Sequence, residues 1–369
     1  MYRFEAKHDA IPEEERRKLS SFFSHDLMGE IALEWSELIR SSIKQDHELI
    51  IFKIYSEDNL VGIAILSVIR KLEITQWMSV PPLFKAFTHF NVGFVEIPLS
   101  NMSGILTRED IDHHERQNIM NALCDHIRRT IDIDILCIKT NTPDDQESNA
   151  LLCPKMLPLD FPPNTLLEYP YSNFDEYLNT LSRKKRRRCL SDKRTLEKGK
   201  GRVERVHDIA TLYKEIYALY RNTSEQAQAK RDYISMPVQI NEDFFEKIHL
   251  FRRMNPCVVT VVVDGKIIAY SLLLQSGSTL FFKAVGLDYD LSYRTKAYFN
   301  LFYAALEYAG HQQCNKVDFG MTSYQFKQWL GCELTPATYL CSTFHPLLSF
   351  VQKPLVSFVE RKIRSGGAK

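Results

Sequence analysis

The feature that most constrains the fold is an order of sequence patterns that occurs twice along the chain. Each copy has two β-rich runs joined by a polar turn, then a further strand pattern, an amphipathic helix pattern and a short apolar run. The first copy occupies residues 47–69, 91–100, 111–130 and 133–140, and the second 257–276, 279–286, 296–310 and 315–321. This repetition predicts one α+β unit that is built twice.

Turn chemistry supports the hairpin in each copy. In the second copy Asp264-Gly265 separates two apolar runs, and a tight primed turn needs positive φ at such central residues. In the first copy Asp58-Asn59 is a less ideal version of the same signal. We therefore expect a mostly antiparallel mixed sheet flanked by helices in each half.

A proline-rich stretch separates the two copies. Prolines disfavour both helix interiors and central strands, so we interpret this stretch as a linker with a boundary near residue 165. The prolines in question are Pro154, Pro158, Pro162, Pro163 and Pro170. The predicted domains are residues 1–165 and 166–345, followed by a C-terminal helix and tail at 346–369. For that tail, packing on the C-terminal domain is favoured over lying on an anionic membrane.

Composition limits the class of protein. The 369 residues carry 47 Lys plus Arg against 46 Asp plus Glu, so the net charge of +1 creates no global field toward polyanions. Eight cysteines, none in a CxxC pair, indicate reduced thiols of an intracellular protein. No secretion signal and no apolar run long enough to span a bilayer are evident, which predicts a cytoplasmic protein.

One segment of the chain, residues 183–205, carries a large local excess of positive charge. Residues 183–205 contain twelve Lys or Arg and three Asp or Glu, and the apolar spacing from Phe174 predicts a helix that runs through the block to Gly199. A solvated helix face is one interpretation, and a nuclear localisation signal is formally another. A phosphate-binding surface fits better, because Arg and Lys both suit phosphoryl oxygens. Duplex DNA is disfavoured, since no recognition module is found.

The C-terminal half resembles a known family. The helix LSRKKRRRCL is followed by the helix TLYKEIYALYRN, the hairpin VVVDGKIIAYSLLL, the strand FFKAVGLDYD, the helix YFNLFYAALEYAG and the segment VDFGMTSYQFKQWLGCEL. This order resembles the GNAT-related acyltransferases of the FemAB-like and BioF2-like type. The resemblance covers roughly residues 174–335 and implies tandem GNAT domains, with the N-terminal half as a degenerate partner.

The resemblance also implies an acyl donor that carries phosphate. Enzymes of the GNAT type hold the pyrophosphate of coenzyme A on glycine-rich backbone at a helix N-terminus, whereas Tyr293–Tyr298 contains no glycine. That departure weakens acetyl-CoA as donor, and some FemAB-like members take the acyl group from aminoacyl-tRNA instead. The phosphopantetheine arm of an acyl carrier protein is a further candidate for the basic helix. No permanently bound cofactor is expected. The candidate donor-binding residues are Arg186, Arg187, Arg188, Arg294 and Lys296.

The end of the last repeated strand is the candidate catalytic site. Acyl transfer to an amine needs a deprotonated amine, a stabilised oxyanion and a proton for the leaving group. Asp318 is a candidate base, or equally a turn residue after the strand. Tyr324 is a candidate proton donor, or equally a packing partner of Trp329. Lys327, which the family pattern places here, would neutralise the oxyanion or a phosphate.

Further candidates are weighed in the same way. Lys283 and Tyr270 are candidate acceptor-binding residues, although Lys283 could equally face solvent at a strand edge. The run His113-His114-Glu115 suggests a metal, but adjacent histidines point to different sides of a helix and no third ligand is suitably spaced. A helix start is favoured there, with no metal site.

The leading hypothesis is an N-acyltransferase that moves an acyl or aminoacyl group from a CoA, carrier-protein or tRNA donor to an amine. The acceptor would be a small metabolite or an envelope precursor in a cleft between the domains, and transfer of groups other than aminoacyl is preferred. The rival is a non-catalytic GNAT-like protein whose basic helix docks RNA or an acidic partner. The glycine-free stretch favours the rival, whereas Asp318 and Lys327 oppose it.

Overall fold

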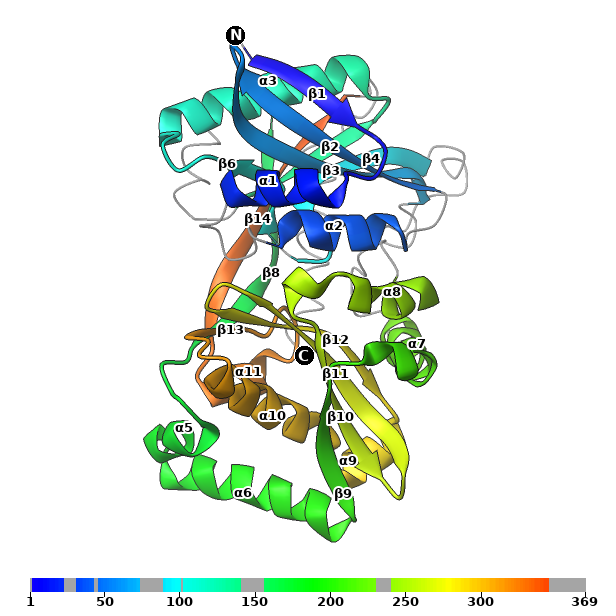
Figure 1. Cartoon of the computed structure of the whole chain (residues 1–369), viewed down its shortest axis with the longest axis vertical. Helices are drawn as coiled ribbons and strands as arrows, with labels where there is room; N and C mark the ends of the chain where they lie inside the picture. Colours follow the sequence, from blue (N-terminus) through cyan, green and yellow to red (C-terminus); the bar gives the residue numbers. More distant parts are fainter. Residues whose placement is uncertain are drawn as a thin grey trace. The chain divides into compact units, whose positions relative to one another are not determined.

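A computed structural model describes residues 2–22, 31–42, 46–73, 89–100, 102–140, 156–229 and 240–344 (Figure 1). The chain divides into two compact units. Unit 1 comprises Met1–Pro163, Asp232–Ile240 and Pro336–Lys369, and unit 2 comprises Asn164–Arg231 and Asn241–Thr335. No helix in the described ranges has both the length and the apolar character needed to cross a membrane.

Unit 1 is built on a mixed sheet with the strand order β1-β2-β3-β4-β7-β14. Its strands are β1 (Tyr2–Lys7), β2 (His47–Ser56), β3 (Asn59–Glu73), β4 (His89–Ile97), β5 (Met102–Ser103), β6 (Ile105–Thr107), β7 (Ile135–Thr140) and β14 (Glu333–Thr343). Its helices are α1 (Glu13–Phe22), α2 (Ala32–Arg40) and α3 (His113–Thr130). Strands β4 and β7 are parallel, while β14 pairs antiparallel with β7.

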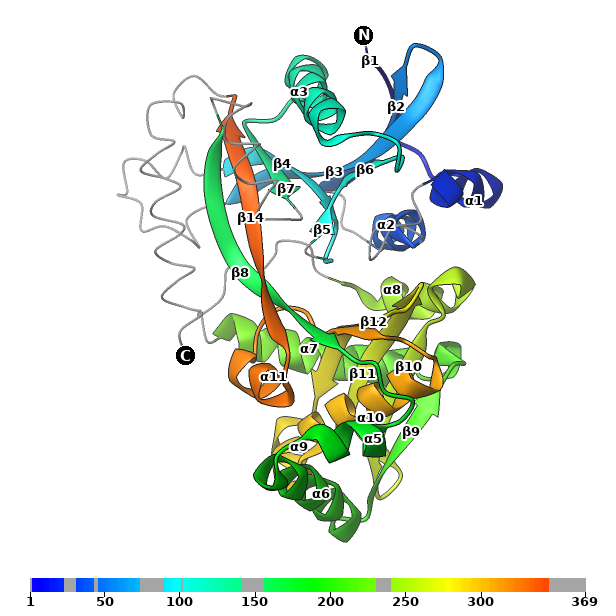
Figure 2. The same cartoon turned by 90° about the vertical axis from the view of Figure 1, so that its left-hand side faces the viewer.

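Each face of the unit 1 sheet has its own apolar contacts. Helix α3 buries Ile119, Leu123 and Ile127 against one face, because these residues recur on one side of the helix. Helix α2 lies on the opposite side, as Figure 2 shows, and the indole N–H of its Trp35 donates to the carbonyl of Pro98 just beyond β4. The two helices therefore enclose the sheet.

Unit 2 repeats the arrangement with the strand order β8-β13-β12-β11-β10-β9. Its strands are the end of β8 (Leu157–Glu168), β9 (Gly201–Val206), β10 (Cys257–Val263), β11 (Lys266–Ser276), β12 (Thr279–Leu287) and β13 (Lys316–Asp318). Its helices are α5 (Phe174–Thr180), α6 (Arg183–Lys198), α7 (Tyr213–Ala229), α8 (Glu242–Lys247), α9 (Tyr289–Thr295), α10 (Ala297–His311) and α11 (Tyr324–Leu330), with short 3-10 turns at Ile209–Thr211, Ile248–Leu250 and Arg252–Met254. Strands β12 and β13 are parallel, and β8 is antiparallel to β13.

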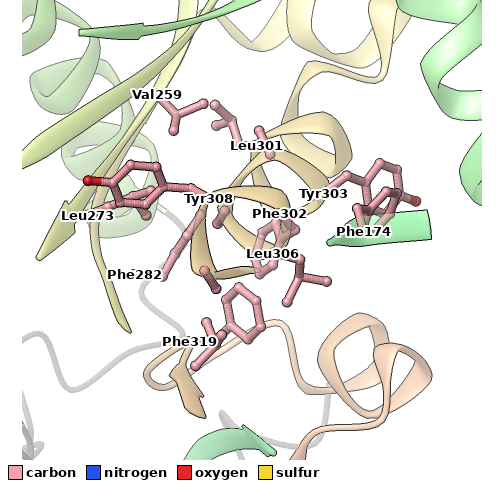
Figure 3. Packing of buried hydrophobic residues seen from close by; sticks show 14 of the residues in the cluster. Phe174, Val259, Leu273, Phe282, Leu301, Phe302, Tyr303, Leu306, Tyr308 and Phe319 are labelled. Carbon is pink, nitrogen blue, oxygen red and sulfur yellow. The ribbon is translucent and has the colours of Figure 1, made fainter. Parts of the chain in front are cut away.

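Helix α10 forms the centre of the unit 2 core. Its Phe302 ring stacks on Phe282 of β12 with centroids 4.5 Å apart, and Phe319 lies 4.9 Å from Phe302 and 5.5 Å from Phe282, so the three rings form one cluster (Figure 3). Helix α7 packs on β12 from the opposite face, where Gly286 allows its backbone to approach closely. Helices thus cover both faces of the sheet, and α7 and α10 pack against the strands that form the candidate site, β12 and β13.

The repeated α+β architecture predicted from the sequence is confirmed. The second hairpin turns at Asp264 (φ 48°) and Gly265 (φ 80°), both in the left-handed region that this turn needs. In the first hairpin the turn residues are instead Glu57 and Asp58, and Glu57 has φ 56°. The predicted C-terminal helix at 346–369 lies outside the described residues.

Two expectations about local structure were wrong. The proline-rich linker contains strand β8, which is hydrogen-bonded to both β14 and β13; its ladder to β13 uses Leu166, Leu167 and Glu168, beyond the last proline in the strand. The single helix expected from 174 to 199 is two helices. Leu181 is extended with ψ 149°, and Ser182 accepts a hydrogen bond from the backbone N–H of Lys185 to begin α6.

Candidate functional site

The candidate site lies where β13 ends beside the parallel strand β12, which continues to Leu287. Phe281 pairs with Asp318, and Lys283 lies two residues farther along β12 on the same face. Asp318 is 2 % exposed, while Lys283 is half-buried. The structure therefore brings an acid and a lysine from neighbouring strands to one edge, as the sequence analysis expected of this region.

Both oxygens of the Asp318 carboxylate accept hydrogen bonds. The backbone N–H of Gly320 donates to Oδ1 at 2.7 Å, and the side-chain Nδ2 of Asn164 donates to Oδ2 at 2.7 Å. The first bond closes a turn after β13, and the second fixes the amide of a residue on β8. Asp318 thus organises its surroundings, and the assignment as a base stays a prediction.

Lys327 is buried, and its ammonium is fully occupied. Nζ donates to the backbone carbonyls of Phe319 at 2.6 Å, Gly320 at 3.0 Å and Met321 at 2.7 Å, which accounts for all three of its N–H bonds. Burial lowers the pKa of Lys327 to about 8, against the opposing effect of the Asp318 carboxylate. Burial likewise lowers the pKa of Lys283, again opposed by Asp318.

The loop that Lys327 holds has an unusual backbone. Gly320, Thr322 and Ser323 all have positive φ, at 68°, 74° and 51°. Non-glycine residues avoid this region, and such strain persists only where surrounding contacts impose it. The three bonds from Lys327 supply that constraint, so the lysine fixes the shape of the loop between β13 and α11.

Tyr324 opens α11 directly after this loop. Its side chain is half-buried. The neighbouring Ser323 hydroxyl accepts a hydrogen bond from the Tyr298 hydroxyl of α10 at 2.9 Å. Trp329, the packing partner suggested by the sequence, stacks on Phe326 with centroids 5.7 Å apart. A role for Tyr324 in proton transfer stays a prediction.

Helix α6 presents most of its cations to solvent. We call the exposed set the basic ridge: Arg183, Lys184, Arg187, Arg188, Arg194 and Lys198. The three arginines expected to bind phosphate have different contacts. Arg187 is exposed, whereas Arg188 lies 5.4 Å from the ring centroid of Phe299 and 5.3 Å from that of Trp329.

Arg186 has a different position from the basic ridge. Its Nε donates to the carbonyl of Leu178 and its second terminal nitrogen to the carbonyl of Asn179, both at 3.0 Å. These carbonyls belong to the last turn of α5, whose acceptors have no intrahelical partner. Arg186 therefore ties α5 to α6.

A buried acid anchors α6 to the core helix. The Tyr303 hydroxyl of α10 donates to Oδ2 of Asp192 at 2.9 Å, and Asn300 donates to the Asp192 carbonyl at 3.2 Å. Cys189 and Leu196 are buried on the same side of α6. Because one face of α6 is fixed to α10 in this way, the opposite face, which carries the basic ridge, has a fixed orientation within unit 2.

The stretch without glycine forms the junction between α9 and α10. Lys296 takes the left-handed conformation there, with φ 59° and ψ 27°, which glycine adopts more readily. Its ammonium lies 4.7 Å from the ring centroid of Tyr293, and Arg294 is exposed on the last turn of α9. The two cations are thus beside the N-terminus of α10, where the sequence analysis placed them.

Tyr270 and the histidine pair lie elsewhere. Tyr270 is completely buried in β11, where its ring centroid lies 6.0 Å from that of Phe245 of α8. This burial does not support the prediction that Tyr270 binds substrate. Burial raises the pKa of its hydroxyl well above the usual value. His113 and His114 begin α3 and contact the amides of Gln117 and Asn118 on their own helix.

Sequence reasoning missed residues that depend on strand pairing. Asn164 gave no signal, because it lies in the stretch interpreted as a linker. In unit 1, Glu96 of β4 and Lys139 of β7 lie at the ends of another parallel pair, and the Tyr339 hydroxyl donates to Glu96. Burial raises the pKa of Glu96 to about 7 and lowers that of Lys139 to about 7. The sequence did contain a signal for this pair, because Glu96 and Lys139 are charged residues inside otherwise apolar strands.

Each unit contains a mixed sheet with one parallel strand pair, an α+β arrangement consistent with a GNAT-like fold. The chain belongs to the FemAB-like family, described as peptidoglycan biosynthesis/recognition, whose profile matches residues 94–357. This membership supports a transferase of acyl or aminoacyl groups. No curated protein sequence matches the chain.

Solved structures share the fold across nearly the whole chain. FemX is 14 % identical with a TM-score of 0.58, covering 94 % of this chain and 100 % of FemX. A tandem GNAT protein from the clavulanic acid biosynthesis pathway is 12 % identical with a TM-score of 0.55, covering 94 % and 99 %. The C-terminal domain of a putative lysylphosphatidylglycerol synthetase from Agrobacterium fabrum is 10 % identical with a TM-score of 0.57, covering 96 % and 98 %.

Proposed function

We propose that this protein transfers an acyl or aminoacyl group from a polyanionic donor to an amine of a cell-envelope precursor or related small metabolite. Among the donors considered, the geometry favours a tRNA ester over a CoA ester or a carrier protein. The observation that carries this proposal is the basic ridge of α6, which is fixed to the core of unit 2.

The length of the basic ridge supports a polynucleotide. Helix α6 has 16 residues and is therefore about 24 Å long, with exposed cations from Arg183 to Lys198. A single pyrophosphate could engage only part of that length, whereas successive phosphates of a nucleic-acid backbone could engage all of it. Counterion release would make such binding strongly dependent on salt.

The junction between α9 and α10 also argues against a CoA ester. Lys296 carries a side chain at the left-handed position where glycine would leave open backbone. A phosphate at this helix end would meet Arg294 and Lys296 instead. Both cations could extend the surface for a larger polyanion, and neither requires the compact pyrophosphate that a glycine-rich cradle selects.

The acceptor amine fits the end of β12 and β13. The amine nitrogen attacks the acyl carbon and a C–N bond forms. The bond between that carbon and the donor oxygen then breaks, and the proton lost by the amine leaves with the donor oxygen. Asp318 and Lys327 support the loop after β13, and Tyr324, which begins α11 directly after this loop, is proposed to supply a proton. The family description of peptidoglycan biosynthesis/recognition supports an envelope precursor as acceptor.

A non-catalytic binding protein is the second candidate, and one observation favours it. All three ammonium N–H bonds of Lys327 and both oxygens of Asp318 are engaged by the protein itself. Groups held in this way can maintain a fold without taking part in chemistry. The basic ridge would then dock RNA without transfer.

Transfer assays separate these two functions. The purified protein is incubated with a peptidoglycan precursor peptide and, in parallel, with radiolabelled aminoacyl-tRNA, acetyl-CoA and a long-chain acyl-CoA. Label in the peptide from the tRNA reaction alone supports the proposal. Label from a CoA ester alone contradicts the tRNA donor, and tRNA binding without transfer from any donor favours the non-catalytic protein.

A further inference from the structure

Among several buried polar atoms of unit 2 that have no hydrogen-bond partner in the described residues, one lies next to Asp318. Oδ1 of Asn164 is buried and receives no hydrogen bond from the part of the chain that the structure describes. The residue as a whole is 9 % exposed. Leaving such an oxygen unpaired is costly, and acceptors of this kind are nearly always satisfied in native proteins. The position therefore calls for a donor that is not among the described residues.

The orientation of this amide is determined by its neighbour. Nδ2 of Asn164 lies 2.7 Å from Oδ2 of Asp318, and a carboxylate can only accept. Rotating the amide by half a turn would place two oxygens against each other. Asp318 is itself fixed by the backbone N–H of Gly320. The side-chain carbonyl of Asn164 must consequently point away from Asp318.

The position of Asn164 places this oxygen at the candidate site. Leu166 of β8 pairs with Asp318 at the end of β13, so Asn164 lies beside the Phe319–Ser323 loop, two residues farther along. The backbone N–H of Phe319 donates to the carbonyl of Thr165, and the N–H of Thr165 donates to the carbonyl of Gly320, which fixes this register. The nearby Lys327 cannot satisfy the oxygen, because its three N–H bonds go to loop carbonyls.

We propose that Asn164 binds the acceptor amine, with its side-chain carbonyl accepting a hydrogen bond from the amine nitrogen. Resting on the acyl transfer proposed above, this assigns Asn164 as the residue that orients the acceptor amine. The oxygen requires a hydrogen-bond donor, which the amine supplies and a substrate carbonyl group cannot. Asp318 is a positioning residue, because it acts on the substrate through Asn164.

A titration that needs no turnover tests the site directly. Protein labelled with 15N-asparagine is titrated with methylammonium, which donates N–H bonds, and with tetramethylammonium, which has the same charge and no N–H. The side-chain amide signals of Asn164 are assigned by triple-resonance experiments. We expect a saturable shift with methylammonium alone. No shift with methylammonium, or equal shifts with both cations, would overturn the proposal.

Kinetics with the donor that supports transfer give the second test. Asn164→Ala should raise the KM for the amine about 10-fold or more while the KM for the donor stays within about twofold, since of the two substrates only the amine loses a hydrogen bond; Asp318 loses its bond from Nδ2 as well. Asn315→Ala, an exposed asparagine just before β13, is the matched control and should change neither constant. An unchanged amine KM in folded Asn164→Ala would refute this role.

The two experiments distinguish this proposal from the function on which it rests. Transfer activity combined with unshifted Asn164 signals would retain the acyltransferase and remove Asn164 from the acceptor site. A selective methylammonium shift without transfer from any donor would instead keep the amine site and contradict the acyltransferase.

Discussion

Replacing Lys327 with Met tests whether this lysine holds the loop between β13 and α11. The variant keeps a long apolar side chain in the buried position but removes the ammonium. Three hydrogen bonds are lost at once: the carbonyls of Phe319 and Met321 lose the Lys327 donor, and that of Gly320 keeps only the bonds from Thr165. Three residues of the loop have positive φ, so the backbone does not favour this conformation by itself and contacts from other groups must hold it.

The size of the effect follows from two opposing contributions. Hydrogen bonds to a charged group contribute about 1.5 to 3 kcal/mol each, so three bonds contribute about 5 to 9 kcal/mol. Removing the buried charge recovers part of this, since a fall in the pKa of Lys327 from 10.5 to about 8 corresponds to about 3 kcal/mol. The expected loss in the free energy of unfolding is about 2 to 6 kcal/mol.

Urea unfolding and hydrogen exchange measure this loss. The unfolding transition of unit 2 is followed by the fluorescence of Trp329 in α11, and exchange is followed in peptides that cover residues 319–330. Lys316→Met is the matched control, because Lys316 makes only a half-exposed ion pair with Glu168. A loss below about 1 kcal/mol in Lys327→Met, with loop protection unchanged, would refute the reasoning.

Arg186→Gln should lower the melting temperature, because the carbonyls of α5 lose the hydrogen bonds from Arg186. Arg187→Gln should leave the melting temperature unchanged. In fluorescence anisotropy it should reduce the slope of log K for tRNA binding against log salt concentration by slightly less than one unit. Glu96→Gln should stabilise the protein relative to wild type, and in urea unfolding this gain should be about 2 to 3 kcal/mol larger at pH 8 than at pH 5. The reason is that the raised pKa of Glu96 in the folded state destabilises the wild type as the pH rises from 4.5 to about 7. Lys139→Met should show the opposite trend, its advantage over wild type shrinking as pH rises from about 7 toward 10.5. Gly286→Ala should cost about 2 kcal/mol or more, since its Cβ would lie 2.7 Å from the backbone of α7, and a normal melting temperature would contradict that packing.

Features that depend on neighbouring residues in the chain could be predicted from the sequence. Asp264-Gly265 specifies its hairpin because both residues tolerate positive φ, and the spacing of Ile119, Leu123 and Ile127 specifies the buried face of α3. The same local reasoning identified the basic block, whose cations are exposed as a helical face.

Features that depend on distant pairing could not be predicted. The prolines before Asn164 indicate a linker, yet the end of the same stretch is a strand because β13 pairs with it. The amide of Asn164 has a role only through Asp318, a residue 154 positions away. The break at Leu181 depends on the contacts of Arg186 with α5, which no apolar periodicity records.

The most direct test of the central claim measures transfer from aminoacyl-tRNA in three proteins. They are the wild type, a basic-ridge variant with Arg187→Gln, Arg194→Gln and Lys198→Gln, and a control in which three exposed cations elsewhere in unit 2 are changed to Gln. The control positions are Lys214, Arg221 and Arg253.

We expect label to pass from aminoacyl-tRNA to the precursor peptide in the wild type and the control with equal KM for tRNA. In the basic-ridge variant the KM should rise, and the salt dependence of tRNA binding should fall by about 2 to 3 units of slope. Equal constants in all three proteins, or no transfer from aminoacyl-tRNA in the wild type, would contradict the function proposed for α6.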